Sequence, residues 1–465
     1  MILAIDQGTT GTTCLVVADD LEVRGRGYVE LPQHFPQPGW VEHDPEEIWT
    51  SVLAATEAAL LNARASAREL RAIGIANQRE TTVLWERRTG QPVGNAIVWQ
   101  DRRTAERCGE LPAARLRELT GLVADPYFSA TKLEWLLGTV ETAEPLAFGT
   151  VDSWLVWKLS GGRTHVTDET NASRTLLAAL ATLDWDDELL ALFGVERDLL
   201  PAIVPSSGVV CEVDLLGATV PVAGIAGDQH AALHAAGGAK ATYGTGAFLL
   251  APTGGDCSPP PHGLLRTAAA RLGTEPRQYA VEGSVFVTGA AVQWLRDGLG
   301  LLADAAESSA IAESVADNGG VYFVPALAGL GSPHWAPEAR GLITGITGGT
   351  QTAHLIRAAL EATAYQTRDV VEAMPVALDR LRADGGQTAN RFLMQFLADL
   401  LAIRVEVPAE REQTALGAAL LAGAAVGFWK ELPQPPPGAA YEPALPRSEA
   451  DRLYAGWRQA LARAL

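Results

Sequence analysis

The chain opens on two short apolar runs joined by a turn of glycine and threonine, and this hairpin is the feature that most constrains the fold. Residues 2–5 (ILAI) and 14–18 (CLVVA) flank Asp6 and the segment QGTTGTT. Short apolar runs bounded by turn residues predict β-strands. Backbone N–H groups and threonine hydroxyls in such a turn can bind phosphate oxygens, and the aspartate can hold Mg²⁺. A β-hairpin with threonines on its surface fits the same residues equally well.

A second turn of this kind lies near the middle of the chain. Residues 239–250 (AKATYGTGAFLL) again place glycine and threonine between apolar runs. We interpret the echo as a weak internal repeat, in which each of two similar halves begins with a phosphate-binding hairpin. Any hairpin rich in glycine and threonine would look alike, so chance similarity is the alternative. Farther along, residues 381–401 predict a strand, a glycine turn and then a helix from residue 390.

The segments after the first turn predict a sheet with helices packed on it. After a third strand at residues 23–31, Asp44 is a helix N-cap and Pro45 the first helical residue, with two glutamates in the first turn. Apolar runs at residues 73–76 and 81–85 predict further strands. The order strand–strand–strand–helix–strand indicates a mixed sheet with helices on its faces.

Charge and composition narrow the class of protein. Lys and Arg number 36 and Asp and Glu 55, so the formal net charge is −19. This balance argues against a nucleic-acid-binding surface and against docking on anionic membranes, but a nucleotide needs only a local site. The N-terminus lacks the basic stretch of a signal peptide, and the apolar run at residues 415–429 predicts a buried helix rather than a membrane span. Because the cysteines are widely spaced and form no CxxC pair, we expect a cytoplasmic protein with reduced thiols.

Charged residues follow two of the predicted strands. Asp228, in GIAGDQHAA, comes after an apolar run and before an Ala-rich helix. It can be the N-cap of that helix or a base exposed at the end of the strand. Arg79 and Glu80 follow the strand at residues 73–76. Neighbouring strand residues point to opposite faces, so the chain must bend or bulge for both side chains to reach one ligand. Such a pair offers donors and acceptors to a polyol, while a surface ion pair is the plain alternative.

No Walker A loop, GxGxxG or HExxH motif occurs in the sequence, which argues against a P-loop NTPase, a Rossmann dehydrogenase and a zinc protease of the HExxH type. The chain instead resembles the FGGY family of carbohydrate kinases, in the form that acts on glycerol. The matching segments run in family order from residue 1 to about residue 430 and include DQGTTGTT, PGWVEHDPEEIW, GIANQRETTVLW, NAIVWQDRRTA, HVTDETNASRTLL, GIAGDQ, YGTGAFLL, VEGSVFVTGAAVQWLRD and DGGQTANRFLMQF. Xylulose and gluconate kinases of the family share the phosphate loops, whereas NQRET and WQDRR look like the glycerol-specific version.

The resemblance implies an α/β fold of two actin-like (ribonuclease-H-like) domains, with mixed sheets flanked by helices, around a central cleft. A domain of residues 1–239 would carry the glycerol site, and a domain of residues 240–465 the nucleotide site. ATP with Mg²⁺ is the expected co-substrate, and sn-glycerol 3-phosphate and ADP are the expected products. A homo-oligomer, a dimer or tetramer, is also implied. The alternatives are an FGGY kinase for another small polyol or ketose, a non-catalytic actin-like binding protein, and an actin-like ATPase or chaperone.

Carried over motif by motif, the resemblance assigns residues to this reaction. Asp228 is the expected base for the attacking hydroxyl, and Asp6 is the carboxylate on the metal side. Trp99 and Phe248 are expected to form apolar walls beside the carbon chain of glycerol. The full glycerol set is Arg79, Glu80, Trp99, Tyr127, Asp228, Gln229 and Phe248, and the full nucleotide set is Thr9, Thr10, Gly11, Thr245, Gly289, Gln293, Gly386 and Asn390.

Two segments depart from the family pattern. The first loop often ends Ser-Ser-Arg, whereas here residues 11–13 are GTT, so backbone donors or another cation must replace an arginine at the phosphates. Residues 206–220 match a region that binds fructose 1,6-bisphosphate in enteric relatives and carries a phosphorylated histidine in some Gram-positive ones. This stretch holds Glu212 and Asp214 but no Lys, Arg or His. Its acidic side chains would repel a bisphosphate, and we predict that neither mode of regulation operates.

Overall fold

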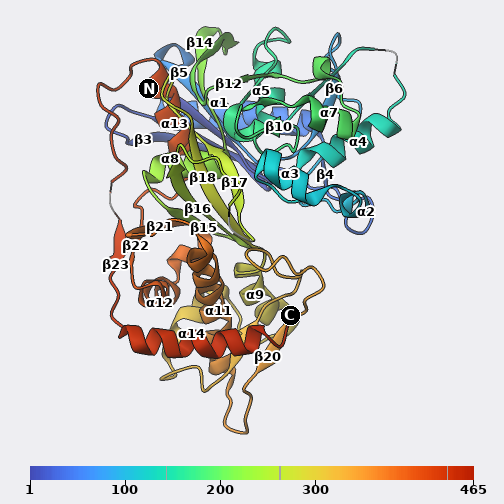
Figure 1. Cartoon of the computed structure of the whole chain (residues 1–465). Helices are drawn as coiled ribbons and strands as arrows, with labels where there is room; N and C mark the ends of the chain where they lie inside the picture. The colour runs from blue at the N-terminus through green and yellow to red at the C-terminus, as the bar shows by residue number, and fades with distance from the viewer. Residues whose placement is uncertain (143, 261–262, 437) are drawn as a thin grey trace.

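Two large β-sheets organise the computed structural model, which describes residues 1–142, 144–260, 263–436 and 438–465 (Figure 1). In the first sheet, β1 pairs antiparallel with β2 and parallel with β5, which confirms the predicted hairpin and the predicted mixed sheet. Its strand order is β13-β14-β5-β1-β2-β3. These strands are β1 (Ile2–Gln7), β2 (Gly11–Val17), β3 (Val23–Glu30), β5 (Ala72–Asn77), β13 (Ser207–Leu215) and β14 (Ala218–Gly227).

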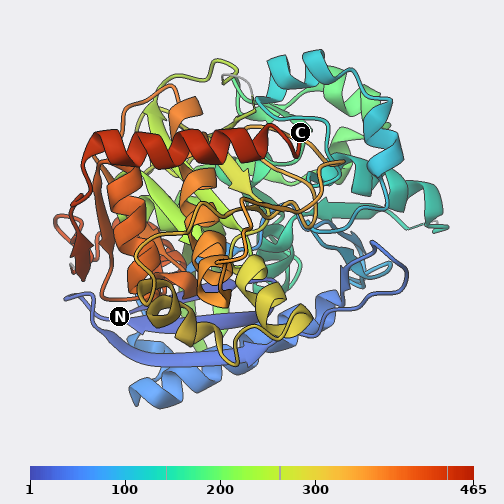
Figure 2. The same ribbon diagram turned by 90° about the horizontal axis from the view of Figure 1, so that it is seen from below.

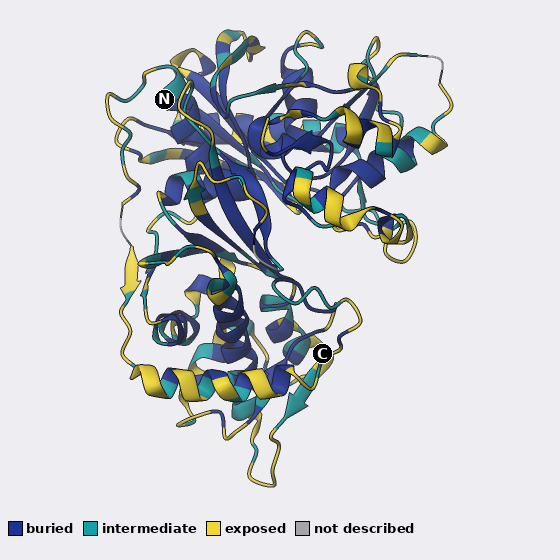
Figure 3. Cartoon of the chain, viewed as in Figure 1, coloured by how far each residue is buried: buried dark blue, intermediate teal, exposed yellow. Residues whose placement is uncertain are grey.

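Helices from distant parts of the chain cover the two faces of this sheet. Leu3 and Ile5 share a core with residues of α1 (Pro45–Ala63), whereas Ile2 and Ala4 share one with residues of α13 (Gln413–Ala425). Alternate residues of a strand point to opposite faces, so a strand buried on both faces is apolar throughout. The first apolar run therefore lies at the centre of the sheet, and both sheets are largely buried (Figure 3).

Local signals fix the start of α1. Asp44 precedes the helix, and its Oδ1 accepts a hydrogen bond from the Glu46 backbone N–H at 2.8 Å. Pro45 is the first helical residue, where the N–H that proline lacks has no partner within the helix. These observations confirm the predicted helix and its N-cap. The helix lies close on β3, because a Cβ on Gly27 would overlap the Ala55 carbonyl oxygen.

The second sheet repeats the strand order of the first. It runs β17-β18-β16-β15-β21-β22-β23, with the antiparallel hairpin β15–β16 at its centre and β21 parallel to β15. In this order β15, β16 and β18 correspond to β1, β2 and β3, while β21, β22 and β23 correspond to β5, β14 and β13. The topology confirms the internal repeat, and β17 is an added edge strand. The strands are β15 (Lys240–Tyr243), β16 (Ala247–Gly254), β17 (Leu265–Ala269), β18 (Gln278–Val285), β21 (Arg380–Asp384), β22 (Arg404–Val407) and β23 (Ala439–Tyr441).

Three helices form a layer on the second sheet: α11 (Thr352–Ala373), α12 (Arg391–Leu401) and α14 (Arg447–Leu461). Tyr243 and Leu381 of the sheet share a core with Tyr365, Leu393 and Trp457 of these helices. α14 runs across the other two, with an exposed outer side (Figures 2 and 3). The strand, glycine turn and helix predicted for this part of the chain are β21, a 3₁₀ turn and α12.

One helix crosses from the second half of the chain to the first sheet. The apolar run predicted to be a buried helix is α13, which ends at Ala425, before the end of that run. It packs against β5 and β14 of the first sheet and against α8 (Asp228–Ala236). Apolar periodicity therefore predicts that this helix is buried, but not which sheet buries it. No helix in the described part of the chain combines the length and apolar character needed to cross a bilayer.

The remaining elements are short, and most of them extend the first half of the chain beside its sheet (Figure 1). A separate apolar core holds this extension together, with Phe128, Leu133, Phe148 and Phe193 among its buried members. The helices are α2 (Ala105–Gly109), α3 (Ala113–Thr120), α4 (Ser129–Thr139), α5 (Val151–Leu159), α6 (Glu169–Ala172) and α7 (Asp187–Phe193), with α9 (Gly289–Gln293) and α10 (Ser308–Glu313) in the second half. The short strands are β4 (Glu42–His43), β6 (Val83–Glu86), β7 (Ala96–Ile97), β8 (Leu146–Gly149), β9 (Val166–Asp168), β10 (Ala178–Ala179), β11 (Asp184–Trp185), β12 (Ala202–Val204), β19 (Tyr322–Val324) and β20 (Leu342–Thr344).

The acidic stretch that departs from the family pattern forms the β13–β14 hairpin at the edge of the first sheet. Its turn is Leu216-Gly217, with φ values of 51° and 77°. The Asp214 carboxylate accepts the Gly217 N–H at 3.0 Å. The hairpin itself holds no basic residue, but Arg163 lies beside it, with Nη2 3.5 Å from the Glu212 carbonyl oxygen. The segment is thus a tight hairpin rather than an open loop, with one guanidinium at its side.

Candidate active site

Three parallel strands of the first sheet end side by side, and the candidate site begins there. In the register of the sheet, Gln7 of β1 lies level with Asn77 of β5, and Asn77 lies level with Gly227 of β14. Ligands of open α/β sheets bind at the carboxyl ends of the strands. The turn after β1, Arg79 after β5 and Asp228 after β14 therefore lie at one edge of the sheet.

The chain bends sharply directly after β5. Glu80 has a φ of 61°, in the left-handed region that residues with side chains seldom adopt. Its carbonyl oxygen accepts hydrogen bonds from the hydroxyls of Ser129 at 2.9 Å and Thr82 at 3.1 Å, and these bonds hold the bend. The side chains of Arg79 and Glu80 are both buried, with 3.9 Å between Nε and Oε1. The bend that two neighbouring residues need in order to reach one ligand is therefore present.

Arg79 is the centre of the site. Its Nε lies 3.2 Å from Asp228 Oδ1, and its Nη2 donates a hydrogen bond to the Tyr127 hydroxyl at 3.2 Å. Asp228 is the first residue of α8, and its Oδ1 also accepts the Gln229 backbone N–H at 2.7 Å. The side chain of Arg79 is 2% exposed and that of Asp228 is 28% exposed. A buried guanidinium thus orients a carboxylate that a ligand can reach.

Aromatic rings from both halves of the chain form one wall of the site. The ring centroid of Trp99 lies 5.6 Å from that of Tyr127 and 6.0 Å from that of Phe248, which belongs to β16 of the second sheet. The Trp99 Nε1–H donates to the Thr9 hydroxyl at 2.9 Å, which joins this wall to the first glycine and threonine turn. Gln229 completes the set, because its Nε2 lies 3.3 Å from Asp228 Oδ2. The structure therefore brings all residues of the predicted glycerol set into one cluster.

A separate cavity of about 470 Å³ lies on the second sheet, at the ends of β15 and β21. It is lined by the turn after β15, the start of α9 and the turn after β21. A Cβ on Gly289 would stand 2.5 Å from the Gly244 carbonyl oxygen, so this close approach requires glycine. The predicted nucleotide residues Thr245, Gly289, Gln293, Gly386 and Asn390 all line this cavity. Thr9, Thr10 and Gly11 belong to the opposite hairpin and do not line it.

Asp6, at the end of β1, lies in an acidic environment. Burial raises the pKa of Asp6 well above its usual range, and the charges of Asp228, Glu412 and Asp384 raise it further. A divalent cation would relieve this repulsion, and Mg²⁺ is usually held by one or two carboxylates together with phosphate oxygens and water. The described residues contain no group of three or more His, Cys, Asp or Glu arranged to hold a metal by themselves. The Asp6 carboxylate is thus a ligand of the kind that Mg²⁺ takes together with phosphate oxygens.

A buried lysine stands where the two halves meet. Position 13, where the resemblance implies an arginine, is a threonine here. In the register of β1 and β2 this Thr13 pairs with Asp6. Lys240, the first residue of β15, is fully buried, and its Nζ donates to Gln229 Oε1 at 2.5 Å. Burial lowers the pKa of Lys240, while the charges of Asp384 and Asp228 act in the opposite direction. This lysine places an amino group beside the candidate site.

Sequence reasoning missed several side chains that contact the predicted set. Glu282 and Arg174 pair with Arg79 and Glu80, and Gln387 donates to the Gly244 carbonyl oxygen at 2.7 Å in the second cavity. All three lie within segments that resemble the family, such as VEGSVFV, NASRT and DGGQTAN. No spacing rule singles them out, because their partners lie far away in the chain.

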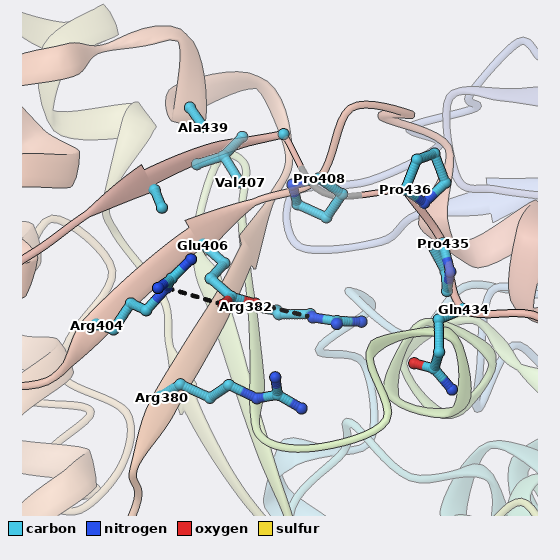
Figure 4. A pocket seen from close by; sticks show the side chains of 12 residues that line it. Arg380, Arg382, Arg404, Glu406, Val407, Pro408, Gln434, Pro435, Pro436 and Ala439 are labelled. Carbon is cyan, nitrogen blue, oxygen red and sulfur yellow. Dashed lines mark hydrogen bonds and ion pairs between the residues drawn. The ribbon is translucent and has the colours of Figure 1, made fainter.

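Another cavity, of about 440 Å³, lies away from these residues, on β21 and β22 (Figure 4). Arg380, Arg382 and Arg404 line it, together with Glu406. The Glu406 carboxylate pairs with the Nε atoms of Arg382 at 3.3 Å and Arg404 at 3.0 Å. This cavity contains none of the predicted site residues.

Two sheets of one topology, each with a glycine and threonine turn, and a cluster of charged and aromatic side chains between them define a two-domain kinase of the actin-like α/β class. The family model for the N-terminal domain of the FGGY family of carbohydrate kinases matches residues 1–235, and the model for its C-terminal domain matches residues 239–426. The chain belongs to the FGGY family of carbohydrate kinases.

Relatives along the whole chain agree with this assignment. The chain is 51% identical to a glycerol kinase of Symbiobacterium thermophilum, over 100% of this chain and 98% of that protein. It is 49% identical to glycerol kinase 2 of Thermotoga maritima, with the same coverage. The structure of a Plasmodium falciparum glycerol kinase with ADP superposes with a TM-score of 0.93 at 34% identity, over 100% of this chain and 98% of that one. A xylulose kinase of Lactobacillus acidophilus, at 21% identity and a TM-score of 0.87 over 99% and 98%, shares the fold.

Proposed function

We propose that this protein is a glycerol kinase, which transfers the γ-phosphoryl group of ATP to a terminal hydroxyl of glycerol and releases sn-glycerol 3-phosphate and ADP. Full-length relatives at 49–51% identity carry this name. The observation that carries the proposal is the cluster around Arg79. Charged groups of Arg79, Glu80 and Asp228 gather beside the ring of Trp99, which suits a molecule with several hydroxyls on a short carbon chain.

Asp228 is the proposed general base. Its carboxylate is accessible, and it is held by Arg79 at 3.2 Å and by the Gln229 N–H at 2.7 Å. In the proposed reaction it accepts the proton of the hydroxyl whose oxygen attacks the γ-phosphorus, while the bond from that phosphorus to the bridging oxygen of ADP breaks. Phosphoryl transfer depends mainly on positioning and electrostatic stabilisation, so the remaining side chains bind and orient.

We propose that the nucleotide occupies the cavity beside Thr245, Gly289 and Asn390, with its phosphates toward the first turn at Thr9 and Thr10. Mg²⁺, with Asp6 on its protein side, supplies positive charge at the phosphates when it is bound. Lys240 is the proposed replacement for the arginine absent at position 13.

We propose a division into domains of residues 1–239 and 240–465, with glycerol held mainly by the first and the nucleotide by the second. Phe248 reaches the glycerol cluster from the second domain, and α13 packs back onto the first sheet. We further propose that the protein works in the cytoplasm as a homo-oligomer, a dimer or tetramer. Light scattering coupled to size-exclusion chromatography tests the assembly, and a monomer at working concentration would contradict it.

The nearest alternative is an FGGY kinase for another small polyol or ketose. A panel of glycerol, dihydroxyacetone, erythritol, xylulose and gluconate in a coupled assay for ADP release separates the two. We expect the highest kcat/KM with glycerol, because the rings of Trp99 and Phe248 are in edge-to-face contact, with centroids 6.0 Å apart, and form one short apolar wall that suits a short carbon chain. A higher kcat/KM with a ketose would contradict the proposal.

A further inference from the structure

Four charged side chains form a closed network next to the proposed glycerol site. Arg79 donates from Nη1 to Glu282 Oε2 at 2.6 Å and from Nη2 to Glu282 Oε1 at 3.2 Å. Arg174 donates from Nη2 to Glu282 Oε1 at 3.1 Å and from Nε to Glu80 Oε1 at 2.6 Å. None of these side chains is more than 2% exposed. Two cations and two anions are therefore buried together, with formal charges that balance.

The network joins the two halves of the chain. Glu282 lies on β18 of the second sheet, whereas Arg79 and Glu80 follow β5 of the first sheet and Arg174 follows α6. Burial alone would raise the pKa of Glu282, but the charges of Arg174 and Arg79 outweigh it and lower that pKa to about 2. The two guanidinium groups thus favour the ionised form of Glu282. Buried ion pairs contribute little net stability compared with apolar packing, so such a network calls for a reason other than stability.

The geometry around Arg79 supplies that reason. Glu282 accepts from both terminal nitrogens of the guanidinium, which leaves Nε to face Asp228 at 3.2 Å. A carboxylate and a guanidinium prefer a bidentate pair. Without the anion on β18, the Tyr127 hydroxyl remains as a partner of Nη2 alone, and this single neutral hydrogen bond does not prevent the guanidinium from turning its terminal nitrogens toward Asp228. It would then neutralise that carboxylate more fully and leave the position that suits a hydroxyl of the substrate.

We infer that Glu282 and Arg174 are positioning residues for the polyol site: Glu282 fixes the orientation of Arg79, and Arg174 fixes Glu80, so that the second sheet sets the geometry of a site carried by the first. This inference rests on the proposed glycerol kinase function. Neither residue needs to touch the substrate, because each acts through its partner. Because this ion-pair network spans both halves of the chain, productive glycerol binding also depends on how the two halves are placed relative to each other.

Three variants of one residue separate a positioning role from a packing role. Glu282→Gln keeps the size and removes the charge, and Glu282→Asp keeps the charge and shortens the side chain. Loss of a hydrogen bond to a charged group costs about 10-fold to 100-fold in affinity. We expect Glu282→Gln to raise the glycerol KM by that factor and the ATP KM by less than about 2-fold, and Glu282→Asp to lie between wild type and Glu282→Gln. A packing role predicts the reverse order, since glutamine fills the space that aspartate leaves empty.

Glu361→Gln is a matched control. Glu361 of α11 is 1% exposed and pairs with Arg357 at 2.8 Å, but it lies outside both proposed sites. We expect this variant to lose stability and to keep the wild-type glycerol KM. If Glu282→Gln does not fold, as judged by circular dichroism, Arg174→Lys gives the same comparison, because it keeps the charge and loses the fork that holds Glu80 and Glu282. A rise in the glycerol KM alone would then support the inference.

The inference is overturned if folded Glu282→Gln has the wild-type glycerol KM, if its glycerol and ATP KM values rise together, or if Glu282→Asp is the worse variant. Failure of the proposed function has a different signature, because it appears in the wild-type protein as a lack of glycerol-dependent ADP release.

Discussion

Replacing Asp228 with asparagine tests the proposed base most sharply. Asparagine has nearly the same shape as aspartate, and it cannot accept a proton at neutral pH. In the structure, Asp228 Oδ1 accepts the Gln229 N–H at 2.7 Å and faces Arg79 Nε at 3.2 Å. The amide oxygen of asparagine can keep both contacts. The variant therefore removes the negative charge and the proton acceptor, together with the 3.3 Å hydrogen bond that Oδ2 accepts from Gln229 Nε2.

The substitution should change the stability of the protein little and its kcat strongly. The Asp228 carboxylate is 28% exposed, so losing its ion pair with Arg79 should cost at most about 1 kcal/mol of stability. Arg79 also keeps Glu282 as a partner at 2.6 Å. A general base contributes about 10²–10⁴-fold to the rate, which corresponds to about 2.7–5.4 kcal/mol of activation free energy. We expect kcat to fall by that factor while the protein stays folded.

A coupled assay for ADP release measures kcat, and titration with ATP followed by intrinsic fluorescence measures nucleotide binding. Binding should be unchanged, because Thr245, Gly289 and Asn390 line a cavity that does not include Asp228. Asp297→Asn, at an exposed aspartate, is the matched control and should leave kcat unchanged. A kcat near that of wild type in Asp228→Asn would remove Asp228 from the role of base. Equal losses of kcat and ATP binding would assign it to the fold instead.

Three further predictions concern the pocket, regulation and stability. Arg79→Ala should raise the glycerol KM by about 10-fold or more and the ATP KM much less, because it leaves Glu282 and Asp228 without the guanidinium that they share. Equal rises of the two KM values in initial-rate measurements would argue for a role of Arg79 in the nucleotide site or the fold. Fructose 1,6-bisphosphate should not inhibit, and saturable inhibition at constant free Mg²⁺ would contradict the account of the β13–β14 hairpin. Burial lowers the pKa of His43 from 6.5 to about 4, so that the unfolded chain takes up the proton at a higher pH than the folded protein does. The free energy of unfolding should therefore decrease as the pH falls from 6.5 to 4, by at most about 1.4 kcal/mol per pH unit. Urea unfolding of His43→Gln should show a smaller loss over that range, and an unchanged loss would exclude His43 as its source.

Local signals in the sequence were enough to predict the elements that frame the site. Asp44 and Pro45 define the start of α1, because capping and the fixed φ of proline act within a few residues. The turn at residues 7–13 and its echo at residues 239–250 gave the two hairpins and the repeat, since turn chemistry is also local. The bend at Glu80 followed from the alternation of side chains along a strand.

The contacts between distant segments could not be predicted in this way. Glu282 reaches Arg79 across 203 positions of the chain, and neither residue carries a local mark of the other. Likewise, the apolar composition of α13 predicts that the helix is buried. It does not predict that α13 packs on the first sheet, because that packing depends on how the two halves of the chain assemble. The contact of Lys240 with Gln229 spans only 11 positions, but it too exists only once β15 and α8 have packed together.

The central claim, phosphoryl transfer from ATP to glycerol at this site, is tested most directly by the stoichiometry of the products. Purified protein is given MgATP and limiting glycerol, and ADP and sn-glycerol 3-phosphate are measured together, the latter with a stereospecific glycerol 3-phosphate dehydrogenase. The account predicts one equivalent of each product per glycerol consumed, and almost no ADP when glycerol is omitted. ADP release that does not depend on glycerol, or a phosphorylated product that the dehydrogenase does not oxidise, would contradict it.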